Sequence, residues 1–141
     1  MIALRRSGFT LLELMVVILV LALLAGLVAP QIFGRVSEAR VATARTQIDL
    51  LGLALDNFRL DNGFYPTTEQ GLAALREKPV RGPVPASWRG PYLRKDVPLD
   101  PWNRPYLYRS PADGTSGFHL SSLGRDGAPG GEGEDADLGG T

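Results

Sequence analysis

A long apolar run begins at Phe9 and continues to Pro30 with a single charged residue, Glu13. A helix needs about 20 apolar residues to cross the roughly 30 Å hydrocarbon core of a bilayer, so this run is long enough to span a membrane. An ionised carboxylate in that core costs about 2.5–3.5 kcal/mol on insertion scales. We therefore expect Glu13 either to have a partner or to lie near the membrane interface.

The short segment before the run contains two arginines, Arg5 and Arg6, and then Gly8. Arginines that flank a membrane helix favour the cytoplasmic side. An ordinary secretory signal is cleaved after its apolar region, but here the small residue precedes that region. Cleavage after Gly8 would leave the apolar helix on the product and create an ammonium group on Phe9. That group could pair with Glu13 of the same helix, four residues away, or with Glu13 of a staggered neighbouring helix and so direct assembly.

The string Gly8-Phe9-Thr10-Leu11-Leu12-Glu13 resembles the processing motif of the type IV pilin and pseudopilin superfamily. The resemblance implies cleavage after Gly8 by a membrane prepilin peptidase, N-methylation of Phe9 and packing of the apolar helices into a fibre. It makes Glu13 an assembly residue. The alternative is a plain membrane anchor with an incidental glutamate.

The composition limits what the rest of the chain can be. After the membrane segment about 110 of the 141 residues remain, which is enough for one small domain. The formal net charge is zero and there is no basic run with interleaved aromatic residues, so nucleic acid is not an expected partner. The chain has no cysteine and therefore no disulfide, whereas 17 glycines and 11 prolines indicate a loop-rich body. A small extracytoplasmic domain of this kind needs another form of stabilisation, and a bound metal ion is a candidate.

Pro30 lies at the end of the apolar run, where it removes a backbone donor and is expected to kink or loosen the helix. A fibre subunit could extend or bend there, which makes Pro30 an assembly candidate; a proline tolerated near the membrane boundary is the alternative. From residue 31 to about 60 the pattern predicts an amphipathic helix that ends near Asp61-Asn62-Gly63. Its apolar stripe consists of Val41, Ala44, Ile48, Leu51, Leu55 and Phe58.

The remaining segments must cover this stripe. Thr67 and Gln70 form a capping-box pattern that predicts a short helix at about residues 68–76. Segments 106–110 and 118–121 are predicted to be two strands of a hairpin joined by residues 111–117. The predicted fold is therefore α+β: a long N-terminal helix, membrane-spanning in its first half and amphipathic in its second, packed on a small loop-rich antiparallel β-sheet. Three aromatic residues are expected to cover the stripe: Trp102, Tyr106 and Tyr108.

Catalytic residues are not apparent in the sequence. His119 is the only histidine, and the serines nearest to it, Ser121 and Ser122, lack the strand-turn-helix context of a nucleophile. A membrane-anchored calcium-dependent hydrolase would need a convergent acid/base pair that the sequence does not contain on ordered elements.

Residues 122–138 combine glycines with five carboxylates, those of Asp126, Glu132, Glu134, Asp135 and Asp137. Calcium takes six to eight oxygen ligands, and such a loop can supply them from carboxylates and backbone carbonyls. The spacing is not that of an EF-hand. Composition alone leaves a calcium site and a solvated tail equally open.

Three further strings resemble the major-pseudopilin family of type II secretion systems: residues 65–75, the turn at residues 100–106 with Asn103 where the family usually has glycine, and the loop from Ser122 to Leu138. Asn103 is expected to keep the turn, since asparagine accepts a positive φ. The resemblance implies a bound Ca²⁺, with Asp126 and either Asp135 or Asp137 as carboxylate ligands, the Leu123 carbonyl as a further ligand and Ser122 as an additional candidate. Glu132 and Glu134 are expected to be solvated.

The same resemblance implies a non-enzymatic structural subunit of the type II secretion pseudopilus, which polymerises through its N-terminal helix to help drive folded proteins across the outer membrane. It implies a leader at residues 1–8, a membrane or fibre-core helix at 9–30 and a periplasmic domain at 31–141, with a single pass through the inner membrane. The expected partners are further copies of the chain, minor pseudopilins, the inner-membrane secretion platform and the prepilin peptidase. A type IV pilin for adhesion or motility is the alternative, although its usual C-terminal disulfide cannot form here.

Overall fold

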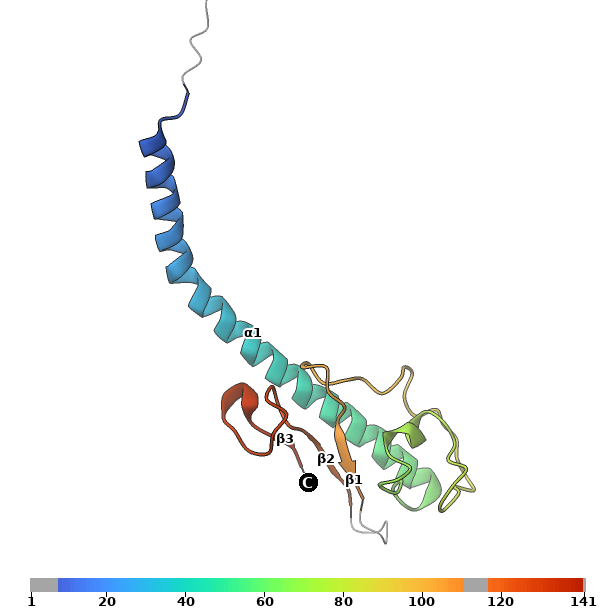
Figure 1. The fold of residues 1–141 in the computed structure, drawn as a ribbon. Coiled ribbons are helices and arrows are strands. Elements are labelled where there is room, and N and C mark those ends of the chain that lie inside the picture. Colours follow the sequence, from blue (N-terminus) through green and yellow to red (C-terminus); the bar gives the residue numbers. More distant parts are fainter. Residues whose placement is uncertain (1–7, 111–116, 141) are drawn as a thin grey trace, which may run out of the picture. The chain divides into compact units, whose positions relative to one another are not determined.

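The computed structural model describes residues 8–110 and 117–140, and for residues 30–33 the backbone only. The chain divides into two compact units, Met1–Ser37 and Glu38–Thr141. Its elements are shown in Figure 1 and follow the order α1 (Leu11–Asn62), η1 (Leu72–Leu75), β1 (Leu107–Arg109), β2 (His119–Ser122), η2 (Gly133–Asp135) and β3 (Leu138–Gly139), where η1 and η2 are 3₁₀ helices. The predicted connection at residues 111–117 lies almost wholly outside the described residues.

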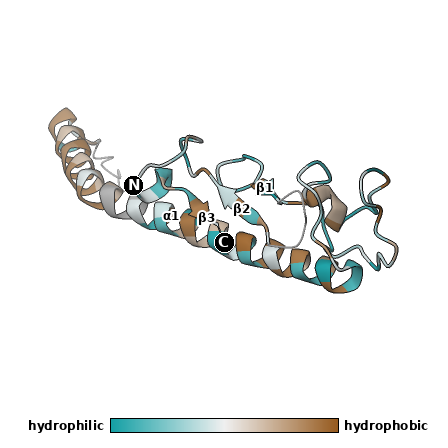
Figure 2. Cartoon of the chain, turned by 90° about the horizontal axis from the view of Figure 1, so that it is seen from below, coloured by the Kyte–Doolittle hydropathy of each residue, from teal (hydrophilic) through white to brown (hydrophobic). Residues whose placement is uncertain are grey.

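In the first unit, α1 is apolar and exposed on all sides. Every described side chain from Phe9 to Val28 is exposed, and the helix is long and apolar enough to cross a membrane by length and composition. Figure 2 shows this part of α1 as almost uniformly hydrophobic. A helix that is apolar all round requires an apolar environment, such as a bilayer or a bundle of other helices. The backbone stays helical through Pro30, so the expected loosening does not interrupt α1, and a role for Pro30 in assembly stays a prediction.

In the second unit, the predicted apolar stripe of α1 forms one side of the core. Ala44, Leu51, Leu55 and Phe58 are buried, and Ile48 packs against the same core cluster. The opposite side of the core comes from Leu72, Ala74, Leu75, Tyr106, Tyr108 and Leu120. The end of the helix at Asn62 agrees with the prediction.

Of the three aromatic residues predicted to cover the stripe, two do so and one does not. Tyr106 and Tyr108 lie in the core, but Trp102 is only half-buried and lies outside the core cluster. Trp88, which was not predicted to do so, packs against the cluster and donates its indole N–H to the Ala74 carbonyl at 3.1 Å.

The sheet is antiparallel and has the order β1-β2-β3. The predicted hairpin pairing is confirmed, with Tyr108 opposite Leu120. The third strand, β3, is not predicted from the sequence; in it Leu138 pairs with Ser122. A strand of two residues has no alternation of apolar and polar side chains, so the sequence provides no pattern by which to find it.

The predicted short helix at residues 68–76 is confirmed only in part, because residues 68–71 form a turn and the 3₁₀ helix η1 covers Leu72–Leu75. The capping-box hydrogen bonds do form, since Thr67 N donates to Gln70 Oε1 at 3.0 Å and Gln70 N donates to Thr67 Oγ1 at 3.1 Å. They close a turn and not an α-helix, because Gly71 adopts a φ of 59°, which a right-handed helix cannot contain. Only the 3₁₀ helix η1 remains beyond it.

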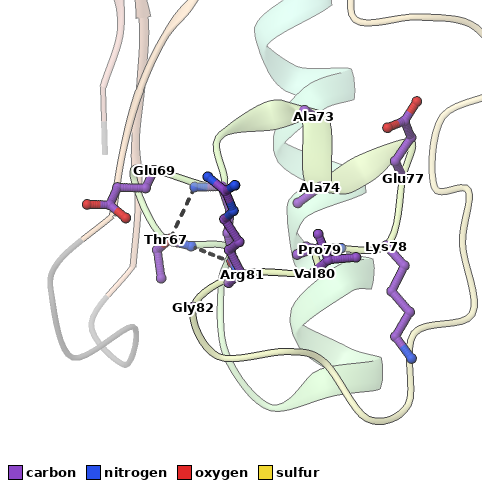
Figure 3. A pocket seen from close by; sticks show the side chains of 11 residues that line it. Thr67, Glu69, Ala73, Ala74, Glu77, Lys78, Pro79, Val80, Arg81 and Gly82 are labelled. Carbon is purple, nitrogen blue, oxygen red and sulfur yellow. Dashed lines mark hydrogen bonds between the residues drawn. The ribbon is translucent and has the colours of Figure 1, made fainter.

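A surface pocket of 340 Å³ opens between this turn and the proline-rich connection that follows (Figure 3). Gln70 holds the connection in place by donating its side-chain amide to the carbonyls of Arg81 and Pro83. None of the predicted site residues lines this pocket.

Candidate functional site

At the start of α1, Thr10 and Glu13 form three hydrogen bonds with each other, with donors on both residues. Glu13 Oε2 accepts from the Thr10 backbone N–H at 2.8 Å and from Thr10 Oγ1 at 3.0 Å, and the Glu13 N–H donates to Thr10 Oγ1 at 3.2 Å. This is a capping box, which satisfies backbone donors that the first turn of a helix leaves unpaired. Within a single chain Glu13 is therefore already bound. Thr10 is not among the predicted site residues, although Thr10 and Glu13 fit the same capping-box pattern, threonine followed three residues later by glutamate or glutamine, that identified Thr67 and Gln70.

The predicted processing residues precede the helix. Phe9 is 84% exposed, and a side chain placed on Gly8 would meet no atom within 4 Å. The Gly8–Phe9 bond is thus not covered by the described part of the chain.

The C-terminal loop is joined to the rest of the domain by a buried carboxylate, Asp100. Asp100 Oδ1 accepts from the backbone N–H groups of Trp102 (3.0 Å) and Arg104 (2.8 Å). Asp100 Oδ2 accepts from Ser122 Oγ at 2.6 Å, and that hydroxyl oxygen also accepts from the Gly124 N–H at 3.2 Å. Asn103 in the same turn has a φ of 64°, as predicted. The hydrogen bond between Ser122 and Asp100 thus fixes the point at which the loop begins. Asp100 is not among the site residues predicted from the sequence.

Arg104 supports the loop from the same turn. Its Nη1 donates to the Gly124 carbonyl at 2.8 Å and also to the Arg125 carbonyl. Gly127 lies so close to this side chain that an added Cβ would come within 2.7 Å of the guanidinium carbon. The φ of Gly127, 68°, also favours glycine at this position.

Arg125 binds the far side of the loop. Its Nε donates to Asp135 Oδ1 at 2.9 Å and its Nη2 to Asp135 Oδ2 at 2.8 Å. Its Nη1 lies 3.4 Å from Glu134 Oε2. These hydrogen bonds and charges hold the pKa of Asp135 below its ordinary value and raise the pKa of Arg125. Such two-point contacts are the strongest that a guanidinium forms with a carboxylate.

Glu134 is not solvated as expected, and this prediction is corrected. Its side chain is only 12% exposed and lies between Arg125 and Arg40 of α1, whose Nη1 is 3.7 Å from Glu134 Oε1. The charge of Glu134 is therefore balanced by arginines from two different elements. Glu132 is exposed, as expected.

The two remaining carboxylates, those of Asp126 and Asp137, are exposed and bind only loop amides. Asp126 Oδ1 accepts from Ala128 N and Asp137 Oδ2 accepts from Gly130 N, both at 3.0 Å. Neither carboxylate forms another hydrogen bond within the described residues. Each therefore retains an oxygen for a further ligand, whereas both oxygens of Asp135 are bound to Arg125.

The donor set fits a calcium ion, although not as a cluster of acidic side chains. Among residues 8–110 and 117–140, no three His, Cys, Asp or Glu side chains are grouped as a metal centre. Calcium, however, also binds backbone carbonyls. The carbonyls of Glu134 and Ala136 converge on Gly124, where a Cβ would lie 2.6 and 2.8 Å from them. The half-buried Leu123 precedes Gly124, and the loop also supplies the carboxylates of Asp126 and Asp137.

The fold and the N-terminal motif define a class of protein: a subunit with a prepilin-like N-terminus on an apolar helix, whose amphipathic continuation packs on a small antiparallel sheet. Residues 31–141 match the family model "Type II secretion system (T2SS), protein G", and residues 3–29 match the "Prokaryotic N-terminal methylation motif". The chain belongs to the protein G family of type II secretion systems, the family of the major pseudopilins.

Similar proteins match this chain over most of its length. The type II secretion system core protein G of Pseudomonas aeruginosa is 48% identical over 136 residues, which cover 96% of this chain and 94% of that protein. The protein of the same name from Vibrio cholerae is 47% identical over 137 residues, covering 96% and 91%. The crystal structure of the major pseudopilin from the type 2 secretion system of enterohaemorrhagic Escherichia coli matches with a TM-score of 0.62 and 37% identity, covering 76% of this chain and 90% of that chain. The chain is thus a pseudopilus subunit of type II secretion, and a pilin for adhesion or motility is not favoured.

Proposed function

We propose that this pseudopilus subunit is made as a precursor in the inner membrane, cleaved after Gly8 and methylated on Phe9, and then assembled through α1. The observation that carries the proposal is the match of residues 3–29 to the methylation motif, together with an apolar first part of α1 whose described side chains are exposed and in which Glu13 is the only charged residue up to Pro30. An exposed apolar helix of this kind is stable only in a bilayer or among other helices. The helix thus suits both the membrane anchor before assembly and the fibre core after it.

The capping box suggests how cleavage leads to assembly. Among the residues that the structure describes, Glu13 accepts hydrogen bonds from Thr10. Cleavage places an ammonium group on Phe9, and a charged donor binds a carboxylate about twice as strongly as a neutral one. A methylated amine keeps its positive charge. Glu13 can then exchange Thr10 for the ammonium group of a neighbouring subunit, because a carboxylate in an apolar environment gains most from a charged partner.

The proposed topology follows from the charges and the helix. Arg5 and Arg6 remain on the cytoplasmic side, α1 passes once through the inner membrane, and the domain from Glu38 onward lies in the periplasm. The partners are other copies of the chain, the prepilin peptidase, minor pseudopilins and the inner-membrane secretion platform.

For the C-terminal loop we propose a calcium site held by the carboxylates of Asp126 and Asp137 and by backbone carbonyls, including that of Leu123. Asp135 is the less suitable candidate because Arg125 binds both of its oxygens. Ser122 positions the loop through Asp100. A bound calcium ion would cross-link the two ends of the loop, and so supply the stabilisation that a chain without cysteine cannot obtain from a disulfide.

The processing part of the proposal is tested by mass spectrometry of the N-terminal peptide from the mature protein. We expect a peptide that begins at Phe9 and carries one methyl group on its amine. A peptide that begins at Met1, or one cut after the apolar run, would contradict the proposal.

A further inference from the structure

Arg125 is the only basic residue within the loop 122–138, which contains five carboxylates. Its main chain and its side chain bind the same segment, η2. The Arg125 N–H donates to the Glu134 carbonyl at 2.8 Å, and the guanidinium forms two hydrogen bonds with Asp135 and an ion pair with Glu134. One residue therefore joins the beginning of the loop to its end.

Two other arginines strengthen this closure from outside the loop. Arg104 donates to the backbone carbonyls of Gly124 and Arg125. Arg40, on α1, lies 3.7 Å from Glu134. Glycines allow the chain to come this close, since a Cβ on Gly131 would lie 2.3 Å from the Asp135 carbonyl oxygen. All of these contacts form between protein groups.

We infer that Arg125 is a resident cation of this loop: it holds the loop closed without calcium, and by binding Asp135 it withholds that carboxylate from calcium and lowers the affinity of the loop for the ion. The statement about affinity rests on the calcium site proposed above; the statement about closure does not.

The two roles predict opposite changes in calcium affinity when Arg125 is replaced. If Arg125 only organised the loop, its removal would weaken calcium binding. If it is a competing cation, its removal strengthens calcium binding, because a positive charge close to a divalent ion disappears and Asp135 becomes free. Coulomb's law in water predicts a gain of about three- to tenfold for charges roughly 8 Å apart. Salt screens exposed charges, so the gain should shrink above about 0.5 M salt.

The test uses the full chain in detergent micelles, with the variants Arg125→Gln, Arg125→Lys and Asp135→Asn. Arg94→Gln is the matched control, because Arg94 is an exposed arginine outside the loop. Hydrogen exchange of amides 124–138 is measured in chelator, and the dissociation constant for Ca²⁺ is measured by titration calorimetry at low ionic strength. The Lys variant keeps the charge but cannot make the two-point contact.

We expect Arg125→Gln and Asp135→Asn to accelerate exchange in the loop at least about tenfold, as loss of a charged hydrogen-bonded pair implies, while Arg94→Gln leaves it unchanged. Arg125→Gln should bind calcium more tightly, and Arg125→Lys close to wild type. Unchanged loop exchange in Arg125→Gln would overturn the closure, and equal or weaker calcium binding would overturn the competition. A loss of affinity of tenfold or more in Asp135→Asn would also overturn it, since Asp135 would then be a ligand. If the wild type binds no calcium, the proposed site and the competition both fail, and the exchange data alone decide the closure.

Discussion

Ser122 donates its hydroxyl hydrogen to Asp100 Oδ2 at 2.6 Å, and both residues are buried. The contact joins a turn that precedes the sheet to the last residue of β2, where the C-terminal loop begins. Because Asp100 also accepts two backbone N–H groups, one carboxylate determines where the loop leaves the domain.

Replacing Asp100 with alanine should therefore destabilise the domain. The change removes three hydrogen bonds and leaves buried donors unpaired, which costs about 3 kcal/mol of unfolding free energy. Denaturant unfolding followed by tyrosine and tryptophan fluorescence measures it. Asp96→Ala is the control, because Asp96 is 98% exposed and forms only a surface ion pair with Arg76, so its effect should stay below about 1 kcal/mol. Equal stability of the two variants would contradict the role of Asp100.

Gly139 and Gly130 form a matched pair for testing the packing of β3. Their φ angles are 97° and 98°, but a Cβ on Gly139 would lie 2.3 Å from the Leu120 carbonyl oxygen, whereas one on Gly130 would meet nothing within 4 Å. Both alanine variants incur backbone strain of about 1–3 kcal/mol, and only Gly139→Ala should in addition displace β3 from β2. We expect a clearly lower melting temperature for Gly139→Ala than for Gly130→Ala. Equal melting temperatures would show that β3 does not pack as described.

Glu13→Ala should leave membrane insertion intact and abolish fibre assembly, because the apolar helix is retained while the partner of the Phe9 ammonium group is lost. Thr10→Ala is the control: it removes the cap, at a cost of about 1 kcal/mol, but keeps the carboxylate. Membrane fractionation and electron microscopy of sheared fibres measure the two properties. Normal fibres from Glu13→Ala would show that assembly does not depend on an ion pair between Glu13 and the Phe9 ammonium group.

Asp126→Ala should lower the melting temperature in calcium to that of the chelated wild type, since a proposed ligand is lost. Glu132→Gln is the control, because Glu132 is an exposed acidic residue of the same loop. This variant should keep the full rise of melting temperature in calcium. An unchanged response in Asp126→Ala would remove Asp126 from the site.

Stability should fall at high pH because of two of the core tyrosines, Tyr106 and Tyr108. Burial raises the pKa of Tyr106 and of Tyr108 to about 12, above the ordinary value of about 10. A raised folded pKa contributes stability below about pH 10 that is lost as the pH rises toward 12. Melting temperatures from pH 9 to 12 should therefore decline, and the decline should be shallower in Tyr106→Phe. Identical profiles would place the titration elsewhere.

Much of the fold can be predicted from local patterns. The apolar run predicts the first part of α1, the stripe from Ala44 to Phe58 predicts its buried face, and Asn103 takes the positive φ that its turn requires. Predictions from local patterns fail where a single residue departs from the pattern. The Thr67 capping box forms, but the positive φ of Gly71 keeps residues 68–71 in a turn, and the helix begins only at Leu72. Trp102, expected in the core, lies outside it, whereas Trp88 packs against it.

The sequence by itself determined the apolar helix, the N-terminal methylation motif and the family, because hydrophobicity, helical periodicity and a contiguous string are all properties of neighbouring residues. Only the tertiary structure decided how the charges are paired: Asp135 with Arg125, Glu134 between Arg125 and Arg40, and Asp100 with Ser122. These partners are separated along the chain by loops whose glycines permit many conformations. Which carboxylates are bound to arginine and which retain an oxygen for a further ligand therefore depends on how the loop closes, and the spacing of acidic residues does not encode that closure.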